Sequence, residues 1–196
     1  MNLPNKLTIF RIILVPIMVI IPFLGFKEEI IGIPISYLLI DAIFIIASIT
    51  DKLDGYLARK NNQITTFGKF LDPLADKILV LAAMVMLVEF NKLPAWIPII
   101  VLAREFMISG YRLIAVEKGG VVIAASKWGK FKTVTQMIAI ILAFIDVNAF
   151  GDCIFGNLHG TALILNILVT VMMILQTIAT IVSGLQYMKG ASKLIK

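Results

Sequence analysis

Residues 51–76 read DKLDGYLARKNNQITTFGKFLDPLAD, a polar stretch between two long apolar segments. It holds four of the twelve acidic residues of the chain, and all four are aspartates: Asp51, Asp54, Asp72 and Asp76. On a helix that turns by about 100° per residue, Asp51 and Asp54 share one face. Asp72 and Asp76 lie one turn apart on a following helix. Two helices can therefore each offer a pair of carboxylates to one shared site.

Four carboxylates at a membrane boundary would repel one another strongly unless a cation neutralised them. Hard oxygen ligands in this number favour Mg²⁺ or Mn²⁺ over zinc or copper. Gly55 and Ala58 share the face of the first pair, and small residues let helix backbones approach closely. An isolated Asp-x2-Asp-Gly would more often be a pair of solvated helix-end residues. The complete stretch predicts a divalent metal site.

The composition predicts an integral membrane protein. Of its 196 residues 60% are hydrophobic, and apolar runs of near 20 residues recur along the chain. Such a run is long enough to cross the hydrocarbon core of a bilayer, which is about 30 Å thick. We therefore expect an all-α bundle of six transmembrane helices in a single domain, 1–196. Their approximate limits are 7–26, 35–59, 68–89, 95–117, 128–146 and 161–188, with residues 2–8 lying along the interface and Pro73 near a first turn.

The distribution of charge predicts an orientation in the membrane. The net charge is +6, and sixteen of the eighteen basic residues fall at alternate helix ends, the others being Lys27 and Lys92. By the positive-inside rule the sixteen are cytoplasmic, on the same side as the four aspartates. A nucleic-acid partner is not indicated, because the basic residues follow helix ends. The single cysteine, Cys153, excludes an intrachain disulfide, and the single histidine, His159, excludes a histidine-rich metal site.

The motif is longer than two aspartate pairs. Asp-x2-Asp-Gly-x2-Ala-Arg-x8-Gly-x3-Asp-x3-Asp runs from 51 to 76 without a gap. It resembles the signature of the CDP-alcohol phosphotransferase family, integral membrane enzymes that make phospholipids. The resemblance implies two divalent ions, Mg²⁺ or Mn²⁺, held by the four aspartates, with Asp76 also the general base. It implies a homodimer, and contacts to a CDP-linked lipid donor from Asn5, Thr8, Gly55, Arg59 and Thr65.

A second group of residues predicts the acceptor. Arg104 and Arg112 lie two turns apart on a predicted helix, and Lys130 and Lys132 lie in the adjoining segment GKFKT. Each one alone would more often be a snorkelling charge that sets topology. Four together, near the cytoplasmic end, predict a pocket for an anionic acceptor. The segments AREFMISGYR (103–112), ASKWGKFKT (125–133) and LPNKLTIFR (3–11) resemble members of the family that use sn-glycerol 3-phosphate.

The implied reaction is transfer of a phosphatidyl group from CDP-diacylglycerol to sn-glycerol 3-phosphate, with CMP leaving. The absence of a transit peptide and the compact length favour a bacterial cytoplasmic membrane, and the charge distribution predicts an active site that faces the cytoplasm. Inositol phosphate, phosphatidylglycerol or serine remain alternative acceptors. An ion or proton transporter is a remote alternative, because the acids lie at one membrane edge and no internal repeat is visible. Asp41, about 15 Å deeper than Asp51 at helical rise, has no assigned role.

Overall fold

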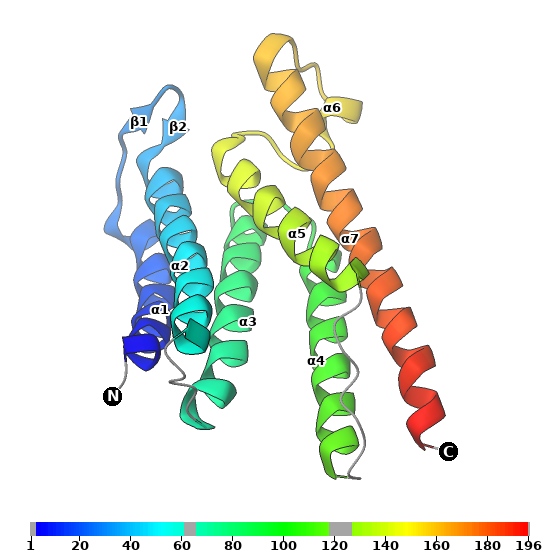
Figure 1. Cartoon of the computed structure of the whole chain (residues 1–196). Coiled ribbons are helices and arrows are strands. Elements are labelled where there is room, and N and C mark those ends of the chain that lie inside the picture. Colours follow the sequence, from blue (N-terminus) through cyan, green and yellow to red (C-terminus); the bar gives the residue numbers. More distant parts are fainter. Residues whose placement is uncertain (1–2, 61–65, 118–126, 196) are drawn as a thin grey trace. The chain divides into compact units, whose positions relative to one another are not determined.

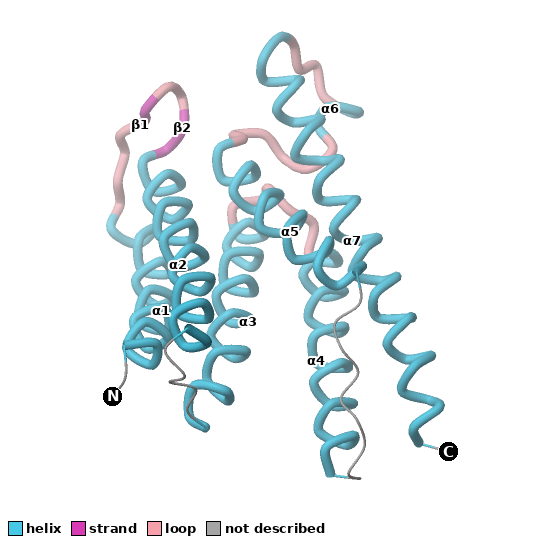
Figure 2. Tube along the Cα trace, in the orientation of Figure 1, coloured by secondary structure: helices cyan, strands magenta, loops and turns pink. Residues whose placement is uncertain are grey.

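The structure is a computed structural model that describes residues 3–60, 66–117 and 127–195. The description does not extend to the side chains of 3–4, 52–60, 66–67, 69–70, 113–117, 127 and 190–195. Figures 1 and 2 show helices as the main element of this part of the chain. Seven α-helices are described: α1 (Leu3–Ile20), α2 (Ile35–Lys60), α3 (Thr66–Glu89), α4 (Trp96–Glu117), α5 (Lys127–Ile145), α6 (Asp152–Phe155) and α7 (Gly160–Ile195). The all-α prediction is confirmed for these residues.

The boundaries of three helices differ from the prediction. Helix α1 begins at Leu3, so residues 3–8, expected to lie along the interface, belong to the helix. It passes at Ile21 into a 3₁₀-helix, η1 (Ile21–Leu24), which contains Pro22. Helix α3 begins at Thr66, so Pro73 lies in its interior rather than in its first turn. The proline ring cannot donate a backbone hydrogen bond there, a local loss that packing against neighbouring helices can offset. Helix α7 continues past the predicted end at 188 to Ile195.

The connectors before α2 and before α7 contain short elements of secondary structure. Residues 27–34 form an antiparallel hairpin of β1 (Glu29–Ile30) and β2 (Ile33–Pro34). Its turn has positive φ at Ile31 and Gly32, 55° and 76°, as a tight two-residue hairpin turn requires. Residues 147–160 contain α6. The buried Asn166 of α7 holds this connector, accepting from the Cys153 amide at 2.8 Å and donating to the Ala149 carbonyl at 2.9 Å.

The backbone groups into two compact units, and the first contains the motif of residues 51–76. It comprises Met1–Phe90 and Ala143–Val147. In it α1 packs against α2 and α3, which also contact each other (Figure 1). Buried apolar side chains recur every three or four residues, as a helix with one packed face requires: Ile40, Phe44 and Ala47 on α2, and Ala75, Leu79 and Ala83 on α3.

The second unit comprises Asn91–Leu142 and Asn148–Lys196, and in it α7 packs against α4 and α6. Helix α7 has the reverse of a water-soluble pattern. Between positions 164 and 185 its exposed side chains are all isoleucine, leucine or valine. Its buried face carries six polar side chains: Asn166, Thr170, Gln176, Thr177, Thr180 and Ser183. An apolar outer face with polar contacts inside is what a hydrocarbon solvent selects, because lipid cannot satisfy polar groups.

Three of the described helices are long and apolar enough to cross a membrane by length and composition. The segments are Asn5–Leu24, Trp128–Ile145 and Gly160–Lys189. Helices α2, α3 and α4 carry the motif aspartates and the Arg104–Glu105 pair, which lower their apolar content. The motif aspartates and Glu105 thus lie on the other long helices, whereas Thr8 lies on α1 and Lys132 on α5.

An ion pair connects α1 to α2 inside the first unit. Arg11 Nη1 lies 2.7 Å from Asp51 Oδ1, and the arginine side chain is fully buried whereas that of Asp51 is 32% exposed. The two halves of the pair therefore differ in their access to water. Removing one partner of a buried pair is costly because the other charge loses its counter-ion, and this cost is larger for the more deeply buried member.

We predict that Asp51→Asn destabilises the protein more than Arg11→Met does. The asparagine would leave a fully buried guanidinium facing a neutral amide, whereas methionine would leave a carboxylate that water can reach. The thermal unfolding midpoint of Asp51→Asn, measured in detergent and chelator, should fall by roughly 5–10 °C. Thr50→Ala is the matched control, since that hydroxyl bonds only the Ala47 carbonyl of its own helix. Equal or reversed losses for the two variants would contradict the assigned burial.

Candidate active site

Helix α1 contacts both halves of the aspartate motif through one polar face. Asn5, Thr8 and Arg11 are spaced by three residues and all are buried. Thr8 Oγ1 donates a hydrogen bond of 2.6 Å to Asp72 Oδ1 on α3, while Arg11 pairs with Asp51 on α2. The first helix thus orients one carboxylate from each half.

The structure describes three of the four motif aspartates. Asp72 and Asp76 lie one turn apart on α3 and are half-buried, as is Asp51 on α2. Asp54, Gly55 and Arg59 lie on the last turns of α2, but their side chains are outside the described part of the chain, and Thr65 is outside the described residues altogether. Asp41 is buried higher on α2.

The donor atoms of the described aspartates fit a hard divalent cation. Asp51 and Asp72 each use Oδ1 on a partner from α1, and within the described residues the second oxygen of each has no hydrogen-bonding or ionic partner. A carboxylate held by one oxygen and open at the other can take up a metal with little loss of side-chain entropy. Among the described residues, which do not include the side chain of Asp54, no three acidic, histidine or cysteine side chains are close enough to form a metal site.

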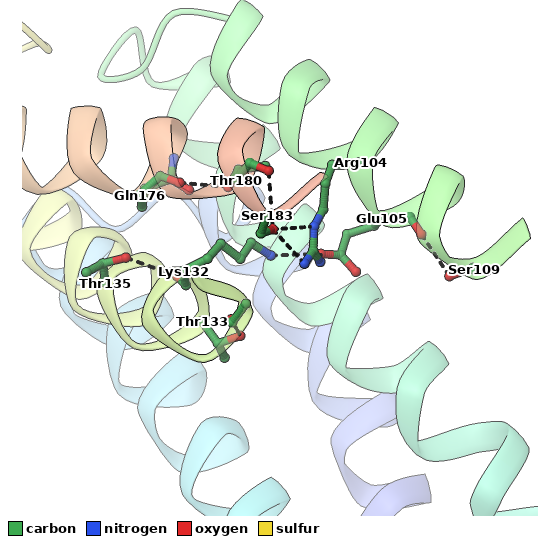
Figure 3. A network of polar contacts seen from close by, with 10 residues as sticks. Arg104, Glu105, Ser109, Lys132, Thr133, Thr135, Gln176, Thr180 and Ser183 are labelled. Carbon is green, nitrogen blue, oxygen red and sulfur yellow. Dashed lines mark hydrogen bonds and ion pairs between the residues drawn. The ribbon is translucent and has the colours of Figure 1, made fainter. Parts of the chain in front are cut away.

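A second polar cluster lies in the other unit, where α4 contributes a carboxylate and a cation, α5 a second cation and α7 a hydroxyl (Figure 3). Glu105 Oε1 lies 2.6 Å from Arg104 Nη1 and 2.9 Å from Lys132 Nζ. The three side chains are 20%, 15% and 7% exposed. Two cations from different helices therefore share one carboxylate oxygen in a mostly buried place.

Helix α7 fixes the same arginine from its other side. Ser183 Oγ accepts from Arg104 Nε at 3.0 Å and from Nη2 at 2.8 Å. Close approach at this point depends on Gly184, where an added Cβ would lie 3.3 Å from Arg104 Cγ. Ser183 and Gly184 thus let the arginine stem pass against the α7 backbone, the role small residues have between membrane helices.

The structure separates the four predicted acceptor cations into two groups. Arg104 and Lys132 meet at Glu105. Arg112 is exposed and its guanidinium carbon lies 6.0 Å from the centre of the Tyr187 ring, and Lys130 is exposed on α5. Neither of these two contacts the Glu105 cluster in the described structure.

Sequence reasoning missed four residues that organise these sites: Arg11, Glu105, Ser183 and Gly184. A signal existed for two of them. An arginine inside an apolar helix, and an acid next to an arginine at the middle of another, must each be paired if they lie in hydrocarbon. Ser183 and Gly184 carry no such signal, because small residues are common on membrane helices and only the packing selects these two.

Comparison with known proteins gives consistent matches. The family model described as CDP-alcohol phosphatidyltransferase matches residues 1–183. A relative from Bacillus subtilis is 51% identical over 146 residues, which cover 71% of this chain and 74% of the relative. A Haemophilus influenzae relative is 47% identical over 143 residues, 71% of this chain and 73% of its own length. A relative from Rickettsia bellii is 34% identical over 193 residues, 98% and 96% of the two chains. All three are named CDP-diacylglycerol–glycerol-3-phosphate 3-phosphatidyltransferase.

The family match covers the aspartate motif, the α1 residues that hold it, and the Glu105 cluster with Ser183. It confirms the resemblance drawn from the sequence, and agrees with the apolar outer surface of the helices. The chain is therefore a membrane protein that belongs to the CDP-alcohol phosphatidyltransferase family, an enzyme family of phospholipid biosynthesis.

Proposed function

We propose that this enzyme transfers a phosphatidyl group from CDP-diacylglycerol to sn-glycerol 3-phosphate and releases CMP. The observation that carries the proposal is that relatives bearing this name match at 34–51% identity, one of them over 98% of the chain. The structure supports it with two features that such a reaction needs. These are carboxylates suited to cations and a buried pair of cations suited to a phosphate.

The acceptor phosphate accounts for the charged cluster of the second unit. Arg104 and Lys132 would bind a phosphate monoester, with Arg112 and Lys130 adding positive potential around it. A neutral acceptor such as serine would leave the two inner cations without a function. Inositol phosphate satisfies the same charge argument, and glycerol 3-phosphate is preferred because the relatives' names specify it.

On the donor side, Asp51, Asp54, Asp72 and Asp76 would hold two divalent ions, Mg²⁺ or Mn²⁺, which when bound neutralise the pyrophosphate and stabilise both oxygens of the displacement. Thr8 fixes the orientation of Asp72 by its hydrogen bond. Asn5, Gly55, Arg59 and Thr65 would contact the donor.

In the transfer step the acceptor hydroxyl oxygen forms a bond to the lipid-side phosphorus, and the bond from that phosphorus to the CMP oxygen breaks. Asp76 would take the proton from the hydroxyl. A carboxylate serves this role when it is held within hydrogen-bonding distance of the hydroxyl and its neighbours are acidic.

The proposal includes the arrangement in the membrane. Helices α1 to α5 and α7 would form six spans of one catalytic domain, 1–196, in a bacterial cytoplasmic membrane. The aspartates and most basic residues would face the cytoplasm. The protein would act as a homodimer.

A transfer assay with the purified protein tests the function. CMP release from CDP-diacylglycerol should require sn-glycerol 3-phosphate and should be much slower with serine, phosphatidylglycerol or inositol phosphate. Asp54→Asn, Asp72→Asn or Asp76→Asn should abolish it, whereas Asp41→Asn should at most weaken it. Chelation should stop the reaction, and Mg²⁺ or Mn²⁺ should restore it. Full activity in chelator would refute the role of the metal, and a faster reaction with another acceptor would reassign the substrate.

Kinetics can separate the acceptor side from the donor side. Lys132→Ala should lower kcat/KM for glycerol 3-phosphate by about ten- to hundredfold, the cost of one charge-assisted phosphate contact. Arg112→Ala, which removes only surrounding positive potential, should lower it by less. The KM for CDP-diacylglycerol should hardly change, and Arg59→Ala should show the reverse. If Arg112 and Lys132 serve only topology, less protein will be inserted but the constants of the folded fraction will be unaltered.

Labelling of single cysteines tests the orientation. Lys60→Cys and Asn148→Cys, each in a variant with Cys153→Ala, should react with a membrane-impermeant maleimide from opposite sides of oriented vesicles. Residue 60 lies between the two aspartate pairs, on the side predicted to be cytoplasmic. Residue 148 lies in a connector without lysine or arginine, which predicts the opposite side. Labelling of both from one side would contradict the six-span arrangement.

A further inference from the structure

We propose that Glu105 is the positioning residue of the acceptor phosphate subsite: one of its oxygens fixes Arg104 and Lys132 together so that both cations meet the same phosphate. This inference rests on the proposed function, because it takes the two cations as the acceptor-binding pair. Figure 3 shows Lys132 and Arg104 reaching Glu105 from different helices. The relevant contacts are those of Oε1, at 2.6 Å and 2.9 Å.

The charges of the cluster suit an anionic ligand. The three side chains carry two positive charges and one negative charge, and each is at most 20% exposed. A phosphate that reaches Arg104 and Lys132 would meet two cations already held at one point, and charge-assisted contacts of this kind are strong.

The hydrogen-bonding capacity of Arg104 points the same way. A guanidinium has five N–H donors. Arg104 uses Nε and one N–H of Nη2 on Ser183, and one N–H of Nη1 on Glu105. The second N–H of each terminal nitrogen has no partner among the described residues. The arginine is thus fixed by three contacts and keeps one N–H donor on each terminal nitrogen, and such donors bind phosphate oxygens.

The carboxylate is needed because Lys132 comes from a different helix. Lysine has a flexible four-carbon stem and would lose much rotamer entropy on being held in one place. It is nearly buried at the start of α5, and the ion pair with Glu105 ties its ammonium to α4. Without the negative charge the two cations, which come from different helices, would repel each other. Part of the free energy of phosphate binding would then be used to bring them together, and the affinity for the acceptor would fall.

Steady-state kinetics of Glu105→Gln, Glu105→Asp and the wild type, in mixed micelles with Mg²⁺, test the proposal. The glutamine variant should raise the KM for glycerol 3-phosphate at least about tenfold, change kcat by no more than about twofold, and leave the KM for CDP-diacylglycerol unchanged. The inhibition constant of inorganic phosphate against glycerol 3-phosphate should rise by the same factor. Glu105→Asp keeps the charge and should recover part of the loss. Thr133→Ala, beside Lys132 but bonded only to the Gly129 carbonyl, is the matched control and should behave as wild type.

The outcomes separate this inference from the proposed function. Absence of CMP release by the wild type with glycerol 3-phosphate would refute the function. A wild type active with this acceptor, together with an unchanged acceptor KM in Glu105→Gln, would refute only the role of Glu105. A lowered KM would mean that the carboxylate competes with the phosphate, and would also overturn the proposal. If Glu105→Gln does not fold, Glu105→Asp decides, because an unaltered acceptor KM in that variant contradicts positioning.

Discussion

A fully buried arginine on the first helix is the constraint on which the first unit depends. Arg11 must keep a counter-ion, and its carboxylate is Asp51, the first residue of the aspartate motif. One helical turn earlier, Thr8 bonds Asp72 at the other half of the motif. The contacts that pack α1 against α2 and α3 are therefore also the contacts that place two of the candidate metal ligands. A change that relaxes α1 also moves the carboxylates, so stability and activity should be coupled here more tightly than at a surface site.

In the second unit, too, a buried ion pair connects two helices. There two cations share one carboxylate oxygen. In both units a charged side chain on one helix is held by a group on another. Such polar contacts help to hold the helices together, because in lipid there is no hydrophobic effect to drive helix packing. Substrate binding and helix packing thus draw on the same polar groups.

Much of the fold followed from hydropathy alone. Lipid selects long apolar helices, so α2, α4 and α5 lie within about one residue of their predicted limits. The aspartate motif followed from its spacing. Contacts between residues distant in sequence were not predicted. Ser183, which contacts Arg104, lies 79 positions from it, and Glu105, which contacts Lys132, lies 27 positions from it. Periodicity reports which face of a helix is buried but not which helix covers it. The interior position of Pro73 in α3 was not predicted for a different reason: tertiary packing can stabilise a helix at a residue whose intrinsic propensity would end it.

The hydroxyl of Ser183 has a consequence for the electrostatics of the enzyme. Its proton points to the Thr180 carbonyl at 3.3 Å, so its lone pairs face the guanidinium and cannot turn away. Arg104 is thereby solvated by a fixed neutral dipole instead of a second acid. The dipole lowers the cost of holding the charge in low dielectric without cancelling it. The field of that charge still extends several ångströms beyond the side chain. The fixed hydroxyl of α7 thus stabilises the Arg104 cation as water would, and it leaves the positive charge available to attract a phosphate dianion.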